Sequence, residues 1–214
     1  MTKFPISPIF IPANKLEYVD KALNSGADGI IFDLEDSVLQ EDKISARDNL
    51  YAFLVKNSLD ILSYIRINDL NTETGITDLD FFKDLDYGII IPKFESDKDF
   101  IKIPDKLSII PLIETPLAIK NLGKIASGRN VTGLAFGAAD LSSIIGSEMN
   151  WDSMLYARSK IINECSINNI FSIDSPFMDT LDTKGLESES KLSKSIGFNG
   201  KATINPSQIN VVKK

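Results

Sequence analysis

Residues 107–119 read LSIIPLIETPLAI, and this stretch indicates the fold. The run Ile109–Ile113 is almost wholly apolar, as expected of a strand buried on both faces of a parallel sheet. Glu114 follows directly, and Thr115 and Pro116 suit the cap and the first position of a helix. The strand is therefore predicted to end at Glu114 and to present this carboxylate at the edge of the sheet.

A second acid has the same predicted placement. Val131–Leu141 reads VTGLAFGAADL, an apolar, Gly-rich segment predicted to be a strand that ends at Asp140. Two carboxylates at the ends of successive strands suit a hard, oxygen-liking cation such as Mg²⁺. The alternatives are that Glu114 only stabilises the start of the following helix and that Asp140 is a turn residue.

Apolar strand-like runs alternate with helical patterns along the whole chain. Besides the two segments above, the predicted strands are Pro8–Pro12, Ile30–Leu34, Ser63–Asn68, Tyr87–Phe94, Ile170–Pro176 and Phe198–Ile204. Eight strands in 214 residues give roughly 27 residues per unit (214/8), within the range of a small (β/α)₈ barrel. We expect residues 1–214 to form one (β/α)₈ TIM barrel, with an open doubly wound sheet as the alternative.

Composition excludes several classes of function. The 30 acidic and 23 basic residues give a net charge of −7, and no basic run suggests a nucleic-acid or membrane partner. Cys165 is the single cysteine, predicted to fill the core, so a reducing cytoplasm is the expected location. The chain has no histidine, which excludes Ser-His triads, His-ligated zinc and a histidine base.

Other charged residues follow the second and third predicted strands. Alternation places Asp33 and Glu35 on one face of their strand, and Asp36 follows. Acids buried in a barrel must be paired, protonated or near a cation. The alternative is that Asp36 or Ser37 only caps a helix and that Glu35 is solvated. Arg66, on an apolar strand, could grip a substrate carboxylate, form an ion pair with Glu35 or Asp36, or do both.

Several of these segments resemble a known family. IFIPANKLEYVDKALNSGADGIIFDLEDSV, IRIN, IPKFES, LIET, LAFGAADL, YARSKII and GFNGKATINPSQI, within residues 8–211, are similar to the citrate lyase β-subunit-like (HpcH/HpaI aldolase/citrate lyase) family. The resemblance implies a (β/α)₈ barrel that acts with Mg²⁺ on coenzyme A or carrier-protein thioesters.

The resemblance also implies roles for individual residues. By position in the motifs, the implied metal ligands are Glu114 and Asp140, the carboxylate-binding residue is Arg66, and the supporting acids are Glu35 and Asp36. Basic residues implied to approach the carrier's phosphates are Lys15, Lys43, Arg47 and Lys93.

Two departures from the family pattern bear on the chemistry. Asn205 stands where the family usually has a histidine, and the usual C-terminal extension, which closes over a site and supplies an acid, does not follow Lys214. We therefore expect a barrel without this lid that binds product-like acids with Mg²⁺ but turns over slowly. The base is then expected to be Asp36, Glu35 or a metal-bound water.

The function implied by the resemblance is reversible cleavage of citryl-, malyl- or citramalyl-thioesters to an acetyl thioester and an oxo acid. Two alternatives remain open. One is a non-catalytic thioester- or dicarboxylate-binding subunit, and the other is a metal-dependent 2-oxo-acid aldolase, against which the absence of histidine argues. The resemblance further implies a homo-oligomer, most often a trimer, with other lyase subunits as further candidate partners.

Overall fold

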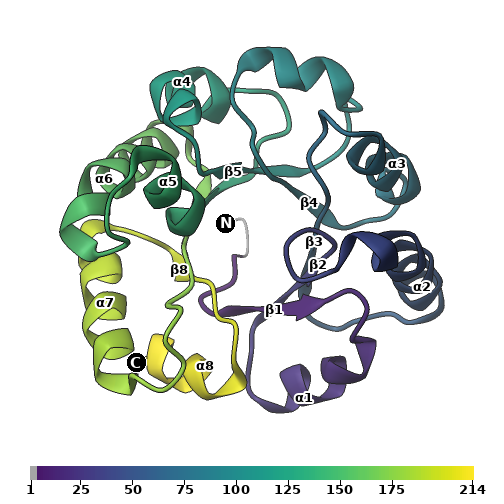
Figure 1. Cartoon of the computed structure of the whole chain (residues 1–214), viewed down its shortest axis with the longest axis horizontal. Coiled ribbons are helices and arrows are strands. Elements are labelled where there is room, and N and C mark those ends of the chain that lie inside the picture. The colour runs from purple at the N-terminus through teal and green to yellow at the C-terminus, as the bar shows by residue number, and fades with distance from the viewer. Residues whose placement is uncertain (1–3) are drawn as a thin grey trace.

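The computed structural model describes residues 4–214 as eight parallel strands in the order β1 to β8, surrounded by helices (Figure 1). Backbone hydrogen bonds from Phe10 N to Thr203 O (2.9 Å) and from Thr203 N to Pro8 O (2.8 Å) join the first strand to the segment after the last. This closure confirms the predicted (β/α)₈ barrel, and the open-sheet alternative is wrong.

The bounds of the elements follow the predicted alternation. The strands are β1 (Pro8–Pro12), β2 (Gly29–Asp33), β3 (Leu62–Arg66), β4 (Gly88–Ile91), β5 (Ile109–Ile113), β6 (Gly133–Phe136), β7 (Phe171–Asp174) and β8 (Gly200–Lys201). The α-helices are α1 (Val19–Asn24), α2 (Lys43–Lys56), α3 (Glu73–Phe82), α4 (Pro116–Ala126), α5 (Ala138–Ile145), α6 (Trp151–Asn168), α7 (Thr183–Ile196) and α8 (Pro206–Val212). Short 3₁₀ helices are η1 (Leu16–Tyr18), η2 (Gln40–Asp42) and η3 (Asp97–Lys102).

Two apolar layers fill the molecule because successive strand side chains point to opposite faces. Residues such as Ile31, Ile90 and Leu112 form the inner cluster within the barrel. Their strand neighbours, among them Ile30 and Phe32, join the larger outer cluster under the helices. The strands are consequently buried on both sides, which explains their nearly continuous apolar sequence.

One predicted boundary is wrong. The strand expected to run to Asp140 ends at Phe136, and Asp140 lies in the first turn of α5. Gly137 precedes this helix and separates the two elements. Figure 1 shows α5 nearer the barrel axis than α4 and α6, so this extra helix leans over the ends of the strands.

Cys165 is buried in α6, as predicted.

Of the helices within residues 4–214, none combines the length and the apolar composition that crossing a membrane requires.

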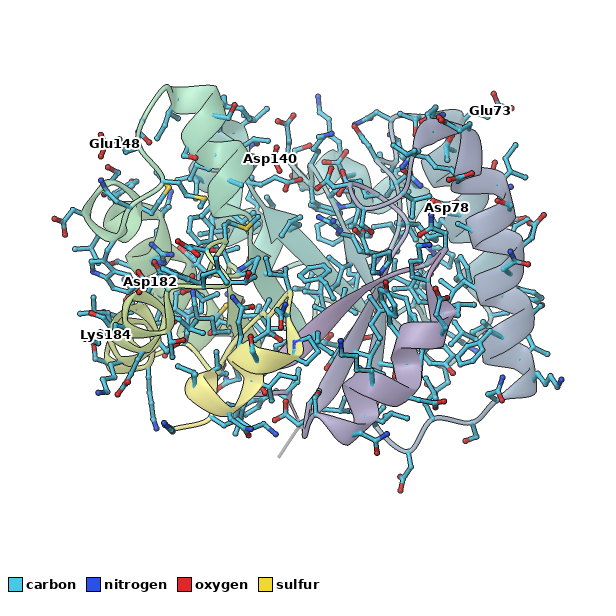
Figure 2. All side chains as sticks on the ribbon, turned by 60° about the horizontal axis from the view of Figure 1, so that its bottom comes forward. Glu73, Asp78, Asp140, Glu148, Asp182 and Lys184 are labelled. Carbon is cyan, nitrogen blue, oxygen red and sulfur yellow. The ribbon has the colours of Figure 1, made fainter. Side chains whose placement is uncertain are left out.

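Buried polar contacts fix the loop after β2. The Nζ atom of Lys43 donates to the carbonyl oxygens of Leu34 (2.9 Å) and Glu35 (2.8 Å) and to Oδ1 of Asn68 (2.6 Å). Asp78, on the inner side of the outer helices in Figure 2, accepts from the backbone N (3.0 Å) and Nδ2 (2.6 Å) of Asn68. This chain of bonds holds residues 34 and 35 at the end of the barrel.

Asp78 also balances a buried cation. Nη1 of Arg47, a residue only 7% exposed, lies 3.3 Å from Oδ1 of Asp78, which is fully buried. The guanidinium also lies over the ring of Phe81 at 4.7 Å. Removing the carboxylate would leave this charge buried without its partner.

We predict that Asp78→Ala lowers the free energy of unfolding by about 3–5 kcal/mol, the usual cost of breaking a buried ion pair from one side. The measurement is equilibrium unfolding in urea. Asp80→Ala removes an exposed acid of α3 that is paired with Lys83 just after the helix, and it is expected to change stability by less than about 0.5 kcal/mol. Equal unfolding midpoints for the two variants would contradict the structural role of Asp78.

Candidate active site

A cavity of about 350 Å³ opens where the strands end. Its floor is apolar and is made of inward-facing strand residues: Phe10, Ile31, Ile90, Leu112, Ala135, Ile173 and Ala202. Its rim is charged and includes Asp33, Asp36, Arg66, Glu114, Asp140 and Asp174. Of the predicted site residues, Arg66, Asp36, Glu114 and Asp140 therefore line one cavity, whereas Glu35, Lys15 and Lys93 do not.

Arg66 is held by a two-point ion pair with Asp33. Nε of Arg66 lies 2.6 Å from Oδ1 of Asp33, and Nη2 lies 2.7 Å from Oδ2. Burial would raise the pKa of Asp33, but the charge and hydrogen bonds of Arg66 outweigh this effect and hold the pKa below its ordinary value. The sequence predicted an ion pair with Glu35 or Asp36; Asp33 makes the shortest contacts.

The other end of the guanidinium faces those two predicted partners. Nη1 lies 3.1 Å from Oδ2 of Asp36, with which it forms a hydrogen bond, and 3.3 Å from Oε2 of Glu35. The ring of Phe10 lies under the guanidinium at 5.1 Å. Of the five N–H groups of arginine, Asp33 and Asp36 accept three, which leaves one each on Nη1 and Nη2 for a ligand.

Glu114 is buried at the end of β5 and is only 2% exposed. Its Oε1 accepts a hydrogen bond from the backbone N of Lys93 (2.7 Å), whose φ of 49° lies in the left-handed region. Burial, and then the charges of Glu35 and Asp140, raise the pKa of Glu114 to about 8. The ionised carboxylate therefore lacks sufficient positive charge around it.

Glu35 is a second buried acid with a raised pKa. Its Oε2 is buried and accepts no hydrogen bond within the described chain, and Nζ of Lys93 lies 3.7 Å from its Oε1. Burial, with the charges of Asp36 and Asp33 adding to it and those of Arg66 and Lys93 opposing it, raises the pKa of Glu35 to about 7. The alternative in which Glu35 is solvated is wrong, because the residue is only 9% exposed.

Asp140 reaches the same rim from α5. It is exposed, lines the cavity, and lies near the middle of that edge of the barrel in Figure 2. The close approach of this segment to Glu114 depends on Gly137, because a Cβ there would lie 2.6 Å from Cβ of Glu114. The two predicted metal ligands thus come from different kinds of element, a strand end and a helix start.

These acids fit a divalent cation. Within residues 4–214 no group of three or more Asp, Glu, Cys or His side chains is arranged to hold a metal alone. Glu114 and Asp140 could supply two oxygen ligands, and waters or a bound acid the others, as is usual for Mg²⁺. The raised pKa of Glu114 indicates that a cation would relieve the repulsion there.

The basic residues divide into two groups. Lys15 and Lys93 are exposed beyond the ends of β1 and β4. Lys43 and Arg47 instead point into the fold, where they bond backbone carbonyls and Asp78. The expectation that Lys43 and Arg47 approach a carrier's phosphates is therefore wrong, because both cations are already used within the structure.

A second charged cluster was missed by the sequence analysis. It comprises Asp174, Lys201, Arg158 and Glu189, of which the first three are at most 2% exposed. The sequence contained a signal, since Asp174 in FSIDSP and Lys201 in GFNGKA are charged residues within two predicted strands. That signal alone could not identify α6 and α7 as the source of the partners.

Comparison with known proteins gives a consistent result. The family model described as HpcH/HpaI aldolase/citrate lyase matches residues 7–206. A (3S)-malyl-CoA thioesterase from Cereibacter sphaeroides is 30% identical over 96% of this chain and 74% of its own length. Sequence relatives thus align along almost the whole barrel.

Solved structures agree with this match. The citrate lyase beta subunit of Mycobacterium tuberculosis, complexed with oxaloacetate and magnesium, is 30% identical and superposes with a TM-score of 0.87, covering 97% of this chain and 94% of that one. The protein CitE from the same organism, in complex with magnesium, acetoacetate and coenzyme A, gives 30% identity and a TM-score of 0.87, covering 97% of this chain and 79% of that one.

We predict that the metal-free protein loses thermal stability as the pH rises from about 5.5 to about 8.5. The pKa values of Glu35 (about 7) and Glu114 (about 8) exceed their ordinary value of 4.5, so the folded state binds more protons than the unfolded state in this range. The stability present at low pH is lost as the pH passes through these folded values. Without histidine, few other side chains titrate there.

The measurement is the melting temperature as a function of pH, with and without MgCl₂. A change of 1 kcal/mol in the free energy of unfolding shifts the melting temperature by roughly 2–4 °C. Magnesium should raise it more at pH 8 than at pH 6, and Glu114→Gln should both flatten the pH dependence and abolish the magnesium effect. Glu17→Gln, on the exposed helix η1, is the control and should resemble the wild type. A metal-free melting temperature that rises over this range would contradict the prediction.

Proposed function

Because the chain belongs to the HpcH/HpaI aldolase/citrate lyase family, we propose that it is a Mg²⁺-dependent carbon–carbon lyase. It cleaves a β-hydroxyacyl thioester to an acetyl thioester and an oxo acid. The observation that carries this proposal is the shared rim on which Arg66, Glu114 and Asp140 meet above an apolar floor. The magnesium and oxaloacetate bound by the tuberculosis relative support it.

In this proposal Glu114 and Asp140 hold the cation. Bound there, Mg²⁺ supplies Lewis-acid polarisation of an oxygen on the acid end of the substrate. Glu114 is fixed for this role by the backbone N–H of Lys93, and Asp140 by the first turn of α5. Both carboxylates thereby face the same ligand from neighbouring parts of the rim.

Arg66 binds the carboxylate of the oxo-acid portion. Asp33 and Asp36 leave one N–H group on Nη1 and one on Nη2, and these can donate to the oxygens of a bound carboxylate. The two-point contact with Asp33 orients the guanidinium before substrate arrives. Such preorganisation keeps the charge in place when the carbon–carbon bond breaks.

A base must take the hydroxyl proton, and we assign this role to Asp36. It lines the cavity, and its side chain is 66% exposed, so a substrate hydroxyl can reach it. Glu35 lies behind the cavity wall and contacts Arg66 and Lys93. Its contribution is to position those two cations rather than to touch the substrate.

The substrate's carrier is proposed to be coenzyme A or an acyl-carrier protein, whose phosphates meet the exposed Lys15 and Lys93. Coenzyme A in the CitE complex supports the first of these. The candidate substrates are the malyl, citramalyl and citryl thioesters of this carrier. We also propose that the protein acts in the cytoplasm as a homotrimer. Other lyase subunits are further candidate partners.

Thioester hydrolysis is a second candidate, because the Cereibacter relative is named a (3S)-malyl-CoA thioesterase. The products separate the two reactions. Cleavage of malyl-CoA releases glyoxylate and acetyl-CoA, whereas hydrolysis releases malate and free coenzyme A.

We predict Mg²⁺-dependent release of glyoxylate, pyruvate or oxaloacetate from malyl-, citramalyl- or citryl-CoA respectively, measured by coupled reduction of the oxo acid. Glu114→Gln should abolish this release while leaving the fold intact by circular dichroism. Free thiol without an oxo acid would support the thioesterase instead. No product from any of the three, or from their carrier-protein thioesters, would favour a non-catalytic binding subunit.

We further predict that Arg66→Lys weakens oxo-acid binding by about 10- to 150-fold, since hydrogen bonds to a charged ligand are lost while the charge remains. The measurement is calorimetric titration of pyruvate in the presence of MgCl₂. Lys102→Arg, a cation of η3 that is bonded to Leu70 and Asn71 and does not line the cavity, is the control. If Arg66→Lys changes the affinity for pyruvate by less than twofold, Arg66 has only a structural role in its ion pairs.

A further inference from the structure

The buried cluster beside β7 converges on one residue of the cavity wall. Asp174 is fully buried, and its two oxygens lie 2.9 Å from Nε of Arg158 and 3.0 Å from Nζ of Lys201. Glu189 completes the charge balance at 2.7 Å from the same Nζ. Burying three charged side chains is costly, and their arrangement fixes the position of the residue that they surround.

Both cations of the cluster contact Ser175. Nζ of Lys201 donates to the Ser175 carbonyl oxygen at 2.6 Å, and Nη2 of Arg158 donates to its Oγ at 3.4 Å. Because Oγ accepts from Arg158, its own proton points elsewhere. Within residues 4–214 no protein acceptor receives that proton.

Ser175 is 4% exposed and lines the main cavity. Among the described residues around this cavity, the side chains with N–H or O–H donors are Arg66, Ser37 and Ser175. Ser37 lies close to Asp33, whose carbonyl oxygen it faces at 3.5 Å, on the same wall as Arg66. Ser175 follows β7, four strands from β3 in a closed barrel of eight, so it lies across the cavity from Arg66.

The proposed reaction needs a donor on that opposite wall. When the bond between the hydroxyl-bearing carbon and the α-carbon breaks, its electron pair stays on the α-carbon and spreads onto the thioester carbonyl oxygen. The hydroxyl proton passes to the base, and the α-carbon then takes up a proton to give the acetyl thioester. A hydrogen bond to the thioester oxygen strengthens as negative charge develops there.

We propose that the Ser175 hydroxyl donates a hydrogen bond to the thioester carbonyl oxygen of the substrate, and that Arg158 and Lys201 hold the serine in place for this. Ser175 is then a catalytic residue, and the two cations are positioning residues. The assignment of the thioester rests on the proposed lyase function.

The test compares Ser175→Ala with Ser172→Ala, which removes a buried serine within β7 that is bonded to Asn199 instead. On the best of the three thioesters, Ser175→Ala should lower kcat by about 10²- to 10³-fold, the usual effect of losing an oxyanion donor. Pyruvate affinity should change less than twofold, and Ser175→Thr should recover most of kcat. Ser172→Ala should keep kcat near the wild-type value. An unchanged kcat in Ser175→Ala would overturn the proposal.

A binding measurement separates this proposal from the lyase function. Acetyl-CoA is titrated into the Mg²⁺-loaded protein, and Ser175→Ala should bind it about 3- to 10-fold more weakly than Ser172→Ala does. If the wild type cleaves no thioester but the two variants still differ in acetyl-CoA affinity, the lyase function is wrong and the Ser175 contact is supported. If both variants bind acetyl-CoA equally, or if the wild type does not bind it, the Ser175 contact is wrong.

Discussion

The ion pair between Arg66 and Asp33 is the contact on which the site depends. The two residues are opposite each other in the register of β3 and β2, so the pair joins neighbouring strands at the level where they end. A buried pair of this kind adds little net stability, but it fixes orientation. Because one edge of the guanidinium is held by Asp33, the other edge must face Asp36 and the cavity. In the proposed function, this constraint sets the position of the substrate's carboxylate.

The sequence predicted the barrel because its strands are buried on both faces, and continuous apolar runs such as Ile109–Ile113 express that burial directly. The ends of the runs also predicted Arg66 and Glu114 at the rim. Asp140 was placed on the wrong element, because the short apolar strand and the following helix share a small, apolar composition around Gly137. Local pattern does not separate a strand end from a helix start there.

Partners of buried charges could not be predicted in this way. The family resemblance implied that Lys43 and Arg47 approach a carrier's phosphates, but Asp78 and the carbonyls that engage them come from other segments of the chain. Ser175 gave no signal at all, since a serine before a proline is typical of a turn. Its surroundings depend on α6, α7 and β8 meeting around β7, which only the assembled barrel determines.

The two charged clusters of the barrel differ in the ratio of anionic to cationic side chains. Around β7 two cations face two anions, Asp174 and Glu189, whereas the rim that follows β2 to β6 carries Asp33, Glu35, Asp36, Glu114 and Asp140 with only Arg66 and Lys93 among them. An anionic substrate that approaches the metal-free rim therefore meets a net negative field. Repulsion of this kind slows encounter and weakens the first contact. The uneven distribution of charge thus favours entry of the divalent cation before the acid.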